Sequence, residues 1–226
     1  MDRKISVLTY NVPHRKTYDT LCLLKARGYE DVSVFAQPMK YVKKRQPLIV
    51  HRPALNVSIP DTKTLCANFG YTYEETDFSA LDSDSVFLLC GAGLLPDEFV
   101  ESHTIINSHP GFVPKARGLD SYKWSVWYGI PIGATTHIIG KYIDAGEIIE
   151  RRMIEIKPED TFHTLALRLY ETEIDMLVTA IEKINEEHEM IIPEETEIFK
   201  RMPEETEEKL LGRFEEYKRE MLKEIK

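Results

Sequence analysis

Two short runs of this chain are almost wholly apolar: Val86–Cys90 (VFLLC) and Thr104–Asn107 (TIIN). A strand without polar alternation is buried on both faces, and a parallel sheet covered by helices is the arrangement that requires such strands. Nearer the N-terminus, the strand-like runs Ile5–Tyr10 and Val32–Ala36 flank a helical segment, Tyr18–Arg27. This alternation predicts an α/β fold, Rossmann-like, with a mostly parallel sheet and helices on both faces.

Further elements are expected along the rest of the 226 residues. They are a third short strand at Pro47–His51, a helix over Pro60–Gly70, two antiparallel strands at Ile132–Ile139 and Glu147–Ile156, a helix capped at Asp160 or Thr161 that reaches about Ile184, and a last helix from about Pro203. The last helix carries an apolar stripe of Leu210, Phe214, Tyr217, Met221 and Ile225. The stripe could pack on the body of the chain or on a second subunit, so a homodimer stays open.

The charge and the cysteines narrow the class of protein. The net charge is −9, and Glu182–Lys226 carries 15 acidic against 9 basic residues, or −6 of it. An acidic chain with a pI near 5.4 and no basic face argues against nucleic-acid binding. The cysteines (Cys22, Cys66 and Cys90) are odd in number and scattered, which fits a reducing compartment. With neither a signal peptide nor a membrane-length apolar run in view, we expect a cytoplasmic protein without a membrane partner.

The densest chemical signal follows the second apolar run. In parallel α/β sheets ligands bind beyond the carboxyl ends of the strands, which points to Gly91–Leu95 and Ser108–Gly118. Asn107 and His109 are two residues apart, so an extended chain directs both side chains to the same face. An amide beside an imidazole can stabilise an oxyanion and move a proton, although such residues after a strand are more often plain turn residues.

A second signal lies between the two expected antiparallel strands. Thr135-Thr136-His137 precedes a glycine-flanked loop, Gly140–Gly146, that contains Asp144. An aspartate in such a loop usually serves the turn. If the fold brings Asp144 to His109, its carboxylate would orient the imidazole and favour the charged form.

Together these segments resemble the formyltransferase family that uses 10-formyltetrahydrofolate. The family signature is Asn-x-His-Pro, a Pro, Arg-Gly, Thr-x-His and Asp-x-Gly-x-Ile. In order, this chain has Asn107, His109-Pro110, Pro114, Arg117-Gly118, Thr135, His137, Asp144, Gly146 and Ile148. The resemblance is clear from about Val86 to Ile181. It divides the chain into a catalytic domain, residues 1–185, and an acidic helical extension, residues 186–226.

The resemblance implies a mechanism and a folate site. Asn107 would stabilise the tetrahedral oxyanion, His109 would act as an imidazolium that delivers a proton to the leaving N10, and Asp144 would orient and charge His109. His137 would be a supporting residue. The pterin site would consist of Phe87, Leu88, Gly91, Leu94, Leu95, Ile139, Gly140 and Asp144. A metal site is not expected, because His51, His103, His109, His137 and Asp144 lack a compact ligand spacing.

Three acceptor classes remain to be weighed. The acidic C-terminal residues argue against initiator tRNA, because phosphates attract basic surfaces. The Asn11–Lys16 loop lacks the glycines that a phosphate cradle for glycinamide ribonucleotide would use. The continuation Arg117–Trp124 resembles the sugar-nucleotide N-formyltransferases, which formylate a dTDP- or GDP-linked amino sugar for surface polysaccharide. The residues predicted to contact that acceptor are Tyr10, Arg15, Lys115, Arg117, Tyr122 and Trp124, with Lys16 and Trp127 as further candidates.

Two other functions fit the same signature. Water could replace the amine, which would make the protein a 10-formyltetrahydrofolate hydrolase. The fold could also bind folate without turnover. Formate release without an acceptor separates the first of these from a transferase, and folate binding without turnover identifies the second.

Overall fold

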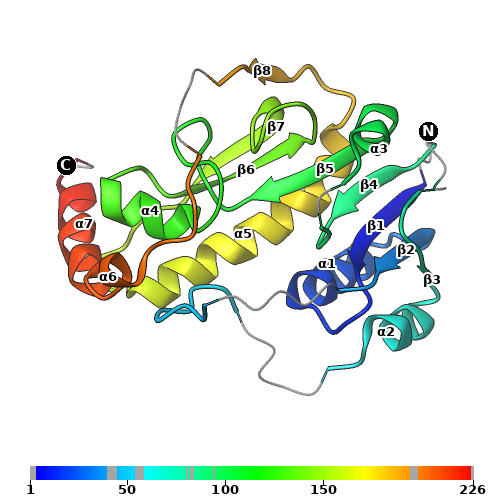
Figure 1. The fold of residues 1–226 in the computed structure, drawn as a ribbon, viewed down its shortest axis with the longest axis horizontal. Helices are drawn as coiled ribbons and strands as arrows, with labels where there is room; N and C mark the ends of the chain where they lie inside the picture. The colour runs from blue at the N-terminus through cyan, green and yellow to red at the C-terminus, as the bar shows by residue number, and fades with distance from the viewer. Residues whose placement is uncertain are drawn as a thin grey trace.

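The computed structural model describes residues 4–39, 45–53, 59–79, 81, 84–93, 95–193 and 198–224. Its strands form one sheet in the order β3-β2-β1-β4-β5-β6-β7-β8 (Figure 1). The strands are β1 (Ile5–Tyr10), β2 (Val32–Gln37), β3 (Thr72–Glu75), β4 (Val86–Leu89), β5 (Thr104–His109), β6 (Gly133–Ile138), β7 (Gly146–Met153) and β8 (Glu189–Ile191). From β3 to β5 all neighbours are parallel, and from β5 to β8 all are antiparallel. The predicted mostly parallel α/β sheet is confirmed.

The helices are α1 (Arg15–Ala26), α2 (Thr62–Phe69), α3 (Asp97–Ser102), α4 (Ser121–Tyr128), α5 (Phe162–Lys183), α6 (Glu204–Glu207) and α7 (Leu210–Glu224). Two of the predicted boundaries have visible causes. Gly70 ends α2 in the left-handed conformation, at φ 76°. Thr161 caps α5, because its hydroxyl accepts from the Thr164 amide while the Thr164 hydroxyl accepts from the Thr161 amide.

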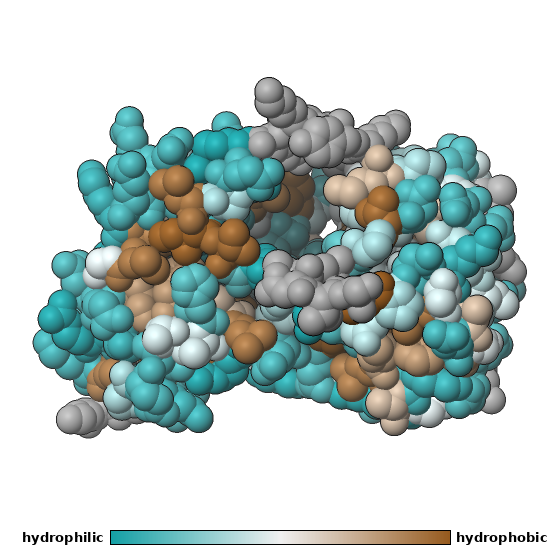
Figure 2. All heavy atoms as spheres, turned by 90° about the horizontal axis from the view of Figure 1, so that it is seen from below, coloured by the Kyte–Doolittle hydropathy of each residue, from teal (hydrophilic) through white to brown (hydrophobic). Residues whose placement is uncertain are grey.

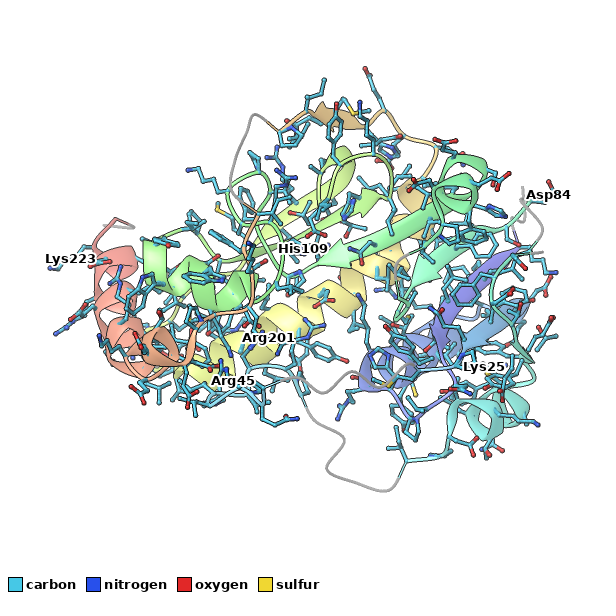
Figure 3. All side chains as sticks on the ribbon, in the orientation of Figure 1. Lys25, Arg45, Asp84, His109, Arg201 and Lys223 are labelled. Carbon is cyan, nitrogen blue, oxygen red and sulfur yellow. The ribbon has the colours of Figure 1, made fainter. Side chains whose placement is uncertain are left out.

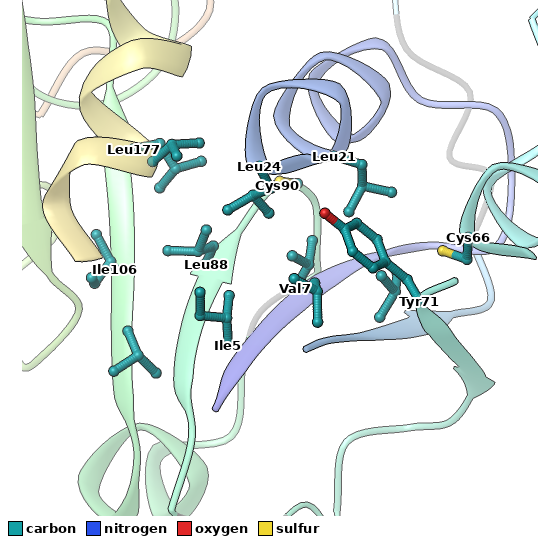
Figure 4. Packing of buried hydrophobic residues seen from close by; sticks show 14 of the residues in the cluster. Ile5, Val7, Leu21, Leu24, Cys66, Tyr71, Leu88, Cys90, Ile106 and Leu177 are labelled. Atoms are coloured by element: carbon teal, nitrogen blue, oxygen red, sulfur yellow. The ribbon is translucent and has the colours of Figure 1, made fainter. Parts of the chain in front are cut away.

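Both faces of the parallel part are covered, as the apolar runs predicted. On one face Val7, Leu88 and Ile106 pack against α1, α2 and α5, as Figure 4 shows in close-up. On the other face Phe87 and Ile105 pack with Phe99 of α3 and other apolar side chains. Leu88 and Phe87 are adjacent and fully buried on opposite faces, so neither has an exposed side.

One expected strand does not form, and β3 was not expected. No strand includes Pro47–His51, because the amides of Leu48 and Ile49 donate to the Glu207 carboxylate and not to a neighbouring strand. The edge strand β3 (TYEE) was not predicted, since its exposed and largely polar side chains give no apolar signal.

The chain beyond residue 185 packs on the body. β8 adds a strand to the sheet beside β7. Leu210, Phe214 and Tyr217 are buried in a cluster that also contains Tyr122 and Phe162. The apolar stripe of the last helix therefore covers the body of the same chain, while Ile225 lies outside the described residues.

Over the described ranges, none of the helices is long and apolar enough to cross a membrane.

Candidate active site

Asn107 and His109 lie near the carboxyl end of β5, where the parallel part of the sheet meets its antiparallel part. Asn107 pairs in register with His137 of β6, and its Nδ2 lies 3.3 Å from His137 Nε2. His137 Nδ1 lies 3.2 Å from the Ile138 carbonyl, which can only accept, so Nδ1 carries the proton and Nε2 accepts from Asn107. Burial lowers the pKa of His137 to about 4, which keeps this ring neutral near pH 7. His137 thus fixes the Asn107 amide.

His109 is buried and held on both nitrogens. Its Nε2 lies 3.0 Å from the Ala116 carbonyl and 3.1 Å from Ser121 Oγ, which itself donates to the Gly118 carbonyl. Both groups accept from Nε2, so a proton is held there. The Nδ1 edge faces the Asp144 carboxylate, with 3.5 Å between Nδ1 and Oδ1. A proton moving to or from a ligand therefore uses the Nδ1 side of the ring.

The loop after β5 passes over His109 so closely that only glycine fits at position 111. A Cβ on Gly111 would lie 2.2 Å from the Ala116 carbonyl oxygen and 2.5 Å from His109 Nε2. The missing side chain lets the loop fold back, so that the Ala116 carbonyl reaches the imidazole.

Asp144 completes the cluster from the loop between β6 and β7. It adopts a left-handed conformation, at φ 45°, and its Oδ2 accepts from the Gly118 amide at 2.9 Å. Its Oδ1 also lies 3.9 Å from His137 Nε2. The fold therefore brings Asn107, His109 and Asp144 together, with His137 behind them, although 37 residues separate Asn107 from Asp144.

A cavity of about 430 Å³ opens on this cluster. Its lining comes from five parts of the chain and consists of Pro47, Val50, His51, Arg52, His109, Pro110, Gly118, Leu119, Asp120, Ser121, Lys123, Asp144 and Arg201. Figure 3 labels His109 at the end of β5 and Arg201 on the segment that runs to α6. Seen from below, the molecule is hollowed between its two halves, and apolar side chains gather beside the hollow towards the C-terminal helices (Figure 2).

Behind the cavity lies a buried ion network. Glu173 of α5 bonds both to Lys16 Nζ, at 2.9 Å, and to both terminal nitrogens of Arg52. Lys16 Nζ also donates to the carbonyl of Ser108, the residue between Asn107 and His109. Two cations share one carboxylate, so this wall of the site keeps one excess positive charge. A smaller cavity of about 290 Å³ lies on the other side of Arg52 and is lined by His14, Arg15 and Tyr170 among others.

The sequence profile of a family described as "Formyl transferase" matches residues 31–181. This match covers about two thirds of the chain and includes every residue of the cluster.

The chain belongs to the formyl transferase family.

Curated relatives and solved structures give the family a wider context. The chain is 31% identical over 108 residues to the methionyl-tRNA formyltransferase of Thermodesulfovibrio yellowstonii, an alignment that covers 46% of this chain and 35% of the relative. It is also 34% identical over 99 residues to the trifunctional purine biosynthetic protein adenosine-3 of Gallus gallus. This alignment covers 41% of this chain and 10% of the relative. The chain thus spans about half or less of the length of these curated relatives.

Similar folds occur in two further solved structures. The N-formyltransferase of Helicobacter canadensis, solved with folinic acid and dTDP-3-aminofucose, has a TM-score of 0.61 at 17% identity and covers 88% of this chain and 71% of its own. The phosphoribosylglycinamide formyltransferase of Anaplasma phagocytophilum has a TM-score of 0.57 at 20% identity. The match covers 88% of this chain and 97% of that one. At these identities the likeness concerns the fold.

The residues predicted to bind folate do not all lie together. Phe87, Leu95 and Ile139 share one apolar cluster, in which Phe87 is fully buried while Leu95 and Ile139 are partly buried, and Gly91 lies against the Tyr10 ring. Leu88 instead packs in the core on the opposite face. Gly140 has open space around it, Asp144 lies beside His109, and Leu94 lies outside the described residues.

The residues predicted to bind the acceptor do not line the cavity beside His109. Tyr122 is buried and its hydroxyl donates to the Phe162 carbonyl, while Trp124 stacks on Phe199 and donates to the Lys200 carbonyl. Arg117 is buried against the Ile143 carbonyl. Of the others, Tyr10 bonds to the Ala92 carbonyl, Arg15 pairs with Asp19 beside the smaller cavity, Lys115 is exposed, and Trp127 packs beside α7.

Sequence reasoning missed the side chains that do line the cavity: His51, Arg52 and Arg201. His51 stacks on Tyr122 and its pKa falls to about 3, mainly through burial. No motif pointed to them, because they come from loops that long-range contacts hold in place. Among the described residues, no group of three or more His, Cys, Asp or Glu side chains is arranged to hold a metal ion.

Proposed function

We propose that this protein is an N-formyltransferase that moves a formyl group from 10-formyltetrahydrofolate to the primary amine of a nucleotide-linked amino sugar. One observation carries the proposal: an amide, an imidazole and a carboxylate meet at Asn107, His109 and Asp144, beside a cavity of about 430 Å³. These groups can stabilise an oxyanion and move a proton, as acyl transfer to an amine requires.

The folate, when bound, supplies the formyl group on its N10. The partly buried side chains of Leu95 and Ile139, which belong to the apolar cluster around Phe87, offer apolar surface to the flat pterin ring. The N-formyltransferase of Helicobacter canadensis, whose fold is similar, was solved with folinic acid, which supports a folate partner here.

The chain's residues then act in sequence on the acceptor amine. As the amine nitrogen bonds to the formyl carbon, the Asn107 amide donates a hydrogen bond to the oxygen that gains charge. His109 supports that charge and gives the proton on its Nδ1 side to N10, whose bond to the formyl carbon breaks. Asp144, 3.5 Å from Nδ1, stabilises the imidazolium and helps to take the proton that the amine loses.

The cavity itself favours an acceptor that is partly a sugar and partly an anion. Pro47, Val50 and Leu119 give it an apolar rim, and Arg52 and Arg201 give it cationic groups. The Asn11–His14 turn offers no phosphate cradle, because Asn11 already bonds to Met39 and Glu75.

The Helicobacter canadensis N-formyltransferase was solved with dTDP-3-aminofucose as well as folinic acid, which adds support for a nucleotide sugar as the acceptor here. On the same reasoning, the reaction would serve the synthesis of surface polysaccharide.

The test is to incubate the protein with 10-formyltetrahydrofolate and one acceptor at a time, and to identify the formylated product by mass spectrometry. The acceptors are dTDP-, GDP- and UDP-linked amino sugars, glycinamide ribonucleotide, and aminoacylated initiator tRNA. We expect N-formyl product from an amino sugar nucleotide. Product from another acceptor, or formate release without any acceptor, would contradict the proposal.

A further inference from the structure

The segment Ile198–Met202, between β8 and α6, is fastened to the loop that follows the catalytic histidine. The Phe199 amide donates to the Arg117 carbonyl at 2.9 Å, and the Leu119 amide donates back to the Phe199 carbonyl at 2.8 Å. The Met202 amide donates to Asp120 Oδ2 at 3.0 Å. These bonds hold the segment in one position beside the cavity, and it contributes Arg201 to the lining.

The contact requires a glycine at position 118. Gly118 has φ 90°, and a Cβ there would lie 2.3 Å from the Phe199 carbonyl oxygen. The Gly118 amide also holds Asp144. The segment thus packs directly against the residue that positions the catalytic carboxylate, so residues 198–202 belong to the site although they lie outside the predicted catalytic domain.

A second link holds the opposite wall of the cavity. The buried Glu207 of α6 accepts from Lys123 of α4, from Arg45, and from the Leu48 and Ile49 amides. The loop carrying these amides continues to His51 and Arg52, which line the cavity. The C-terminal residues therefore hold both the wall that carries Arg52 and the wall that carries Arg201.

Arg201 differs from most other arginines of the described ranges in its pairing. Eight of them form ion pairs with carboxylates: Arg15, Arg27, Arg45, Arg52, Arg151, Arg152, Arg168 and Arg213. Arg201 is exposed, lines the cavity, and makes no hydrogen bond or ion pair with any residue that the structure describes. A planar guanidinium that lines a cavity and has no carboxylate partner is suited to bidentate binding of phosphate oxygens.

We propose that Arg201 binds the diphosphate of the acceptor and so determines that the acceptor is a nucleoside diphosphate conjugate. This deepens the proposed function and rests on it. Arg52 lines the same cavity, and the excess positive charge of its network adds to the attraction. The family profile ends at residue 181, so the residue that selects the acceptor lies outside the matched region.

The first test measures binding without turnover. Isothermal titration calorimetry gives the Kd of dTDP, GDP, UDP and inorganic pyrophosphate for the wild type, Arg201→Ala, Arg201→Lys and Lys200→Ala. Lys200→Ala is the matched control, because it removes the same charge from the adjacent position while the main-chain bond to Trp124 stays. We expect Arg201→Ala to weaken the tightest ligand about tenfold, Arg201→Lys to weaken it less, and Lys200→Ala to change it less than twofold.

Two results would overturn this inference. One is a wild type that binds none of the four probes. The other is an Arg201→Ala protein that binds them as well as Lys200→Ala does. Because Arg201 is exposed, its replacement leaves the core intact, and an unchanged Tm verifies this.

A second test separates this inference from the proposed function. With a formylatable amino sugar nucleotide, Arg201→Ala should raise the KM of the acceptor about tenfold and leave the KM of the folate unchanged. If transfer occurs and the acceptor KM does not move, the role of Arg201 is wrong and the proposed function stands. If diphosphates bind through Arg201 and no amino sugar is formylated, the proposed function fails and the anion site stands.

Discussion

Glu173→Gln tests whether the buried ion network stabilises the fold around the site. The Glu173 side chain is 1% exposed, and it holds the charges of Lys16 and Arg52. Burial alone would raise the pKa of Glu173, but these two cations lower it to about 2, from 4.5. Since each pKa unit corresponds to about 1.4 kcal/mol, the ionised carboxylate contributes about 3 kcal/mol of stability. Removing one partner of a buried pair costs about 3–5 kcal/mol, which is of similar size.

The effect has a defined pH dependence. Because the pKa in the folded protein lies below that of the unfolded chain, this stability is fully present above about pH 4.5 and is lost as the pH falls towards 2. The free energy of unfolding in urea should therefore differ between wild type and Glu173→Gln by about 3 kcal/mol at pH 7, and the difference should shrink below pH 4. Glu171→Gln, an exposed change on the same helix, is the control and should shift stability by less than about 0.5 kcal/mol. Equal effects of the two substitutions at pH 7 would refute the reasoning.

Three further substitutions probe the site and the scaffold. Asn107→Ala should lower kcat by a factor of about 10²–10³ with little change in either KM, because the amide acts on the oxyanion; a wild-type kcat in a folded variant would exclude this role. Gly111→Ala should reduce kcat at least tenfold, since its Cβ would collide with the Ala116 carbonyl and displace His109; retained activity would show that the loop can move away. Gly212→Ala in α7 should instead raise stability by about 0.5–1 kcal/mol, because its Cβ meets nothing within 4 Å and alanine favours a helix; a lower Tm would contradict this.

Two members of the cluster at His109 were within reach of sequence reasoning because they lie on a regular strand. Asn107 and His109 lie on a strand that an apolar run predicted, and the two-residue spacing set their common side. Asp144 could be joined to them only through the family resemblance, since a turn aspartate carries no signal of its partner. The sequence predicted that β4 is buried on both faces, but it did not predict that Phe87, and not Leu88, packs with Leu95 and Ile139.

The lining of the cavity beside His109 could not be predicted in this way. The loop that carries His51 and Arg52 is held by the carboxylate of Glu207, more than 150 residues away along the chain. Arg201 reaches the cavity because main-chain bonds join Phe199 to Arg117 and Leu119, and such bonds cannot be predicted from the residue types. The aromatic residues Tyr122 and Trp124 were assigned a binding role, yet their polar atoms already have partners within the fold.

The most direct test of the proposed function is the rate of tetrahydrofolate release from 10-formyltetrahydrofolate, with and without an amino sugar nucleotide, for the wild type and His109→Ala. We predict release that depends on the acceptor, produces one equivalent of N-formyl sugar, and falls by at least a hundredfold in His109→Ala. Release at the same rate without an acceptor, or a His109→Ala protein as active as the wild type, would contradict it.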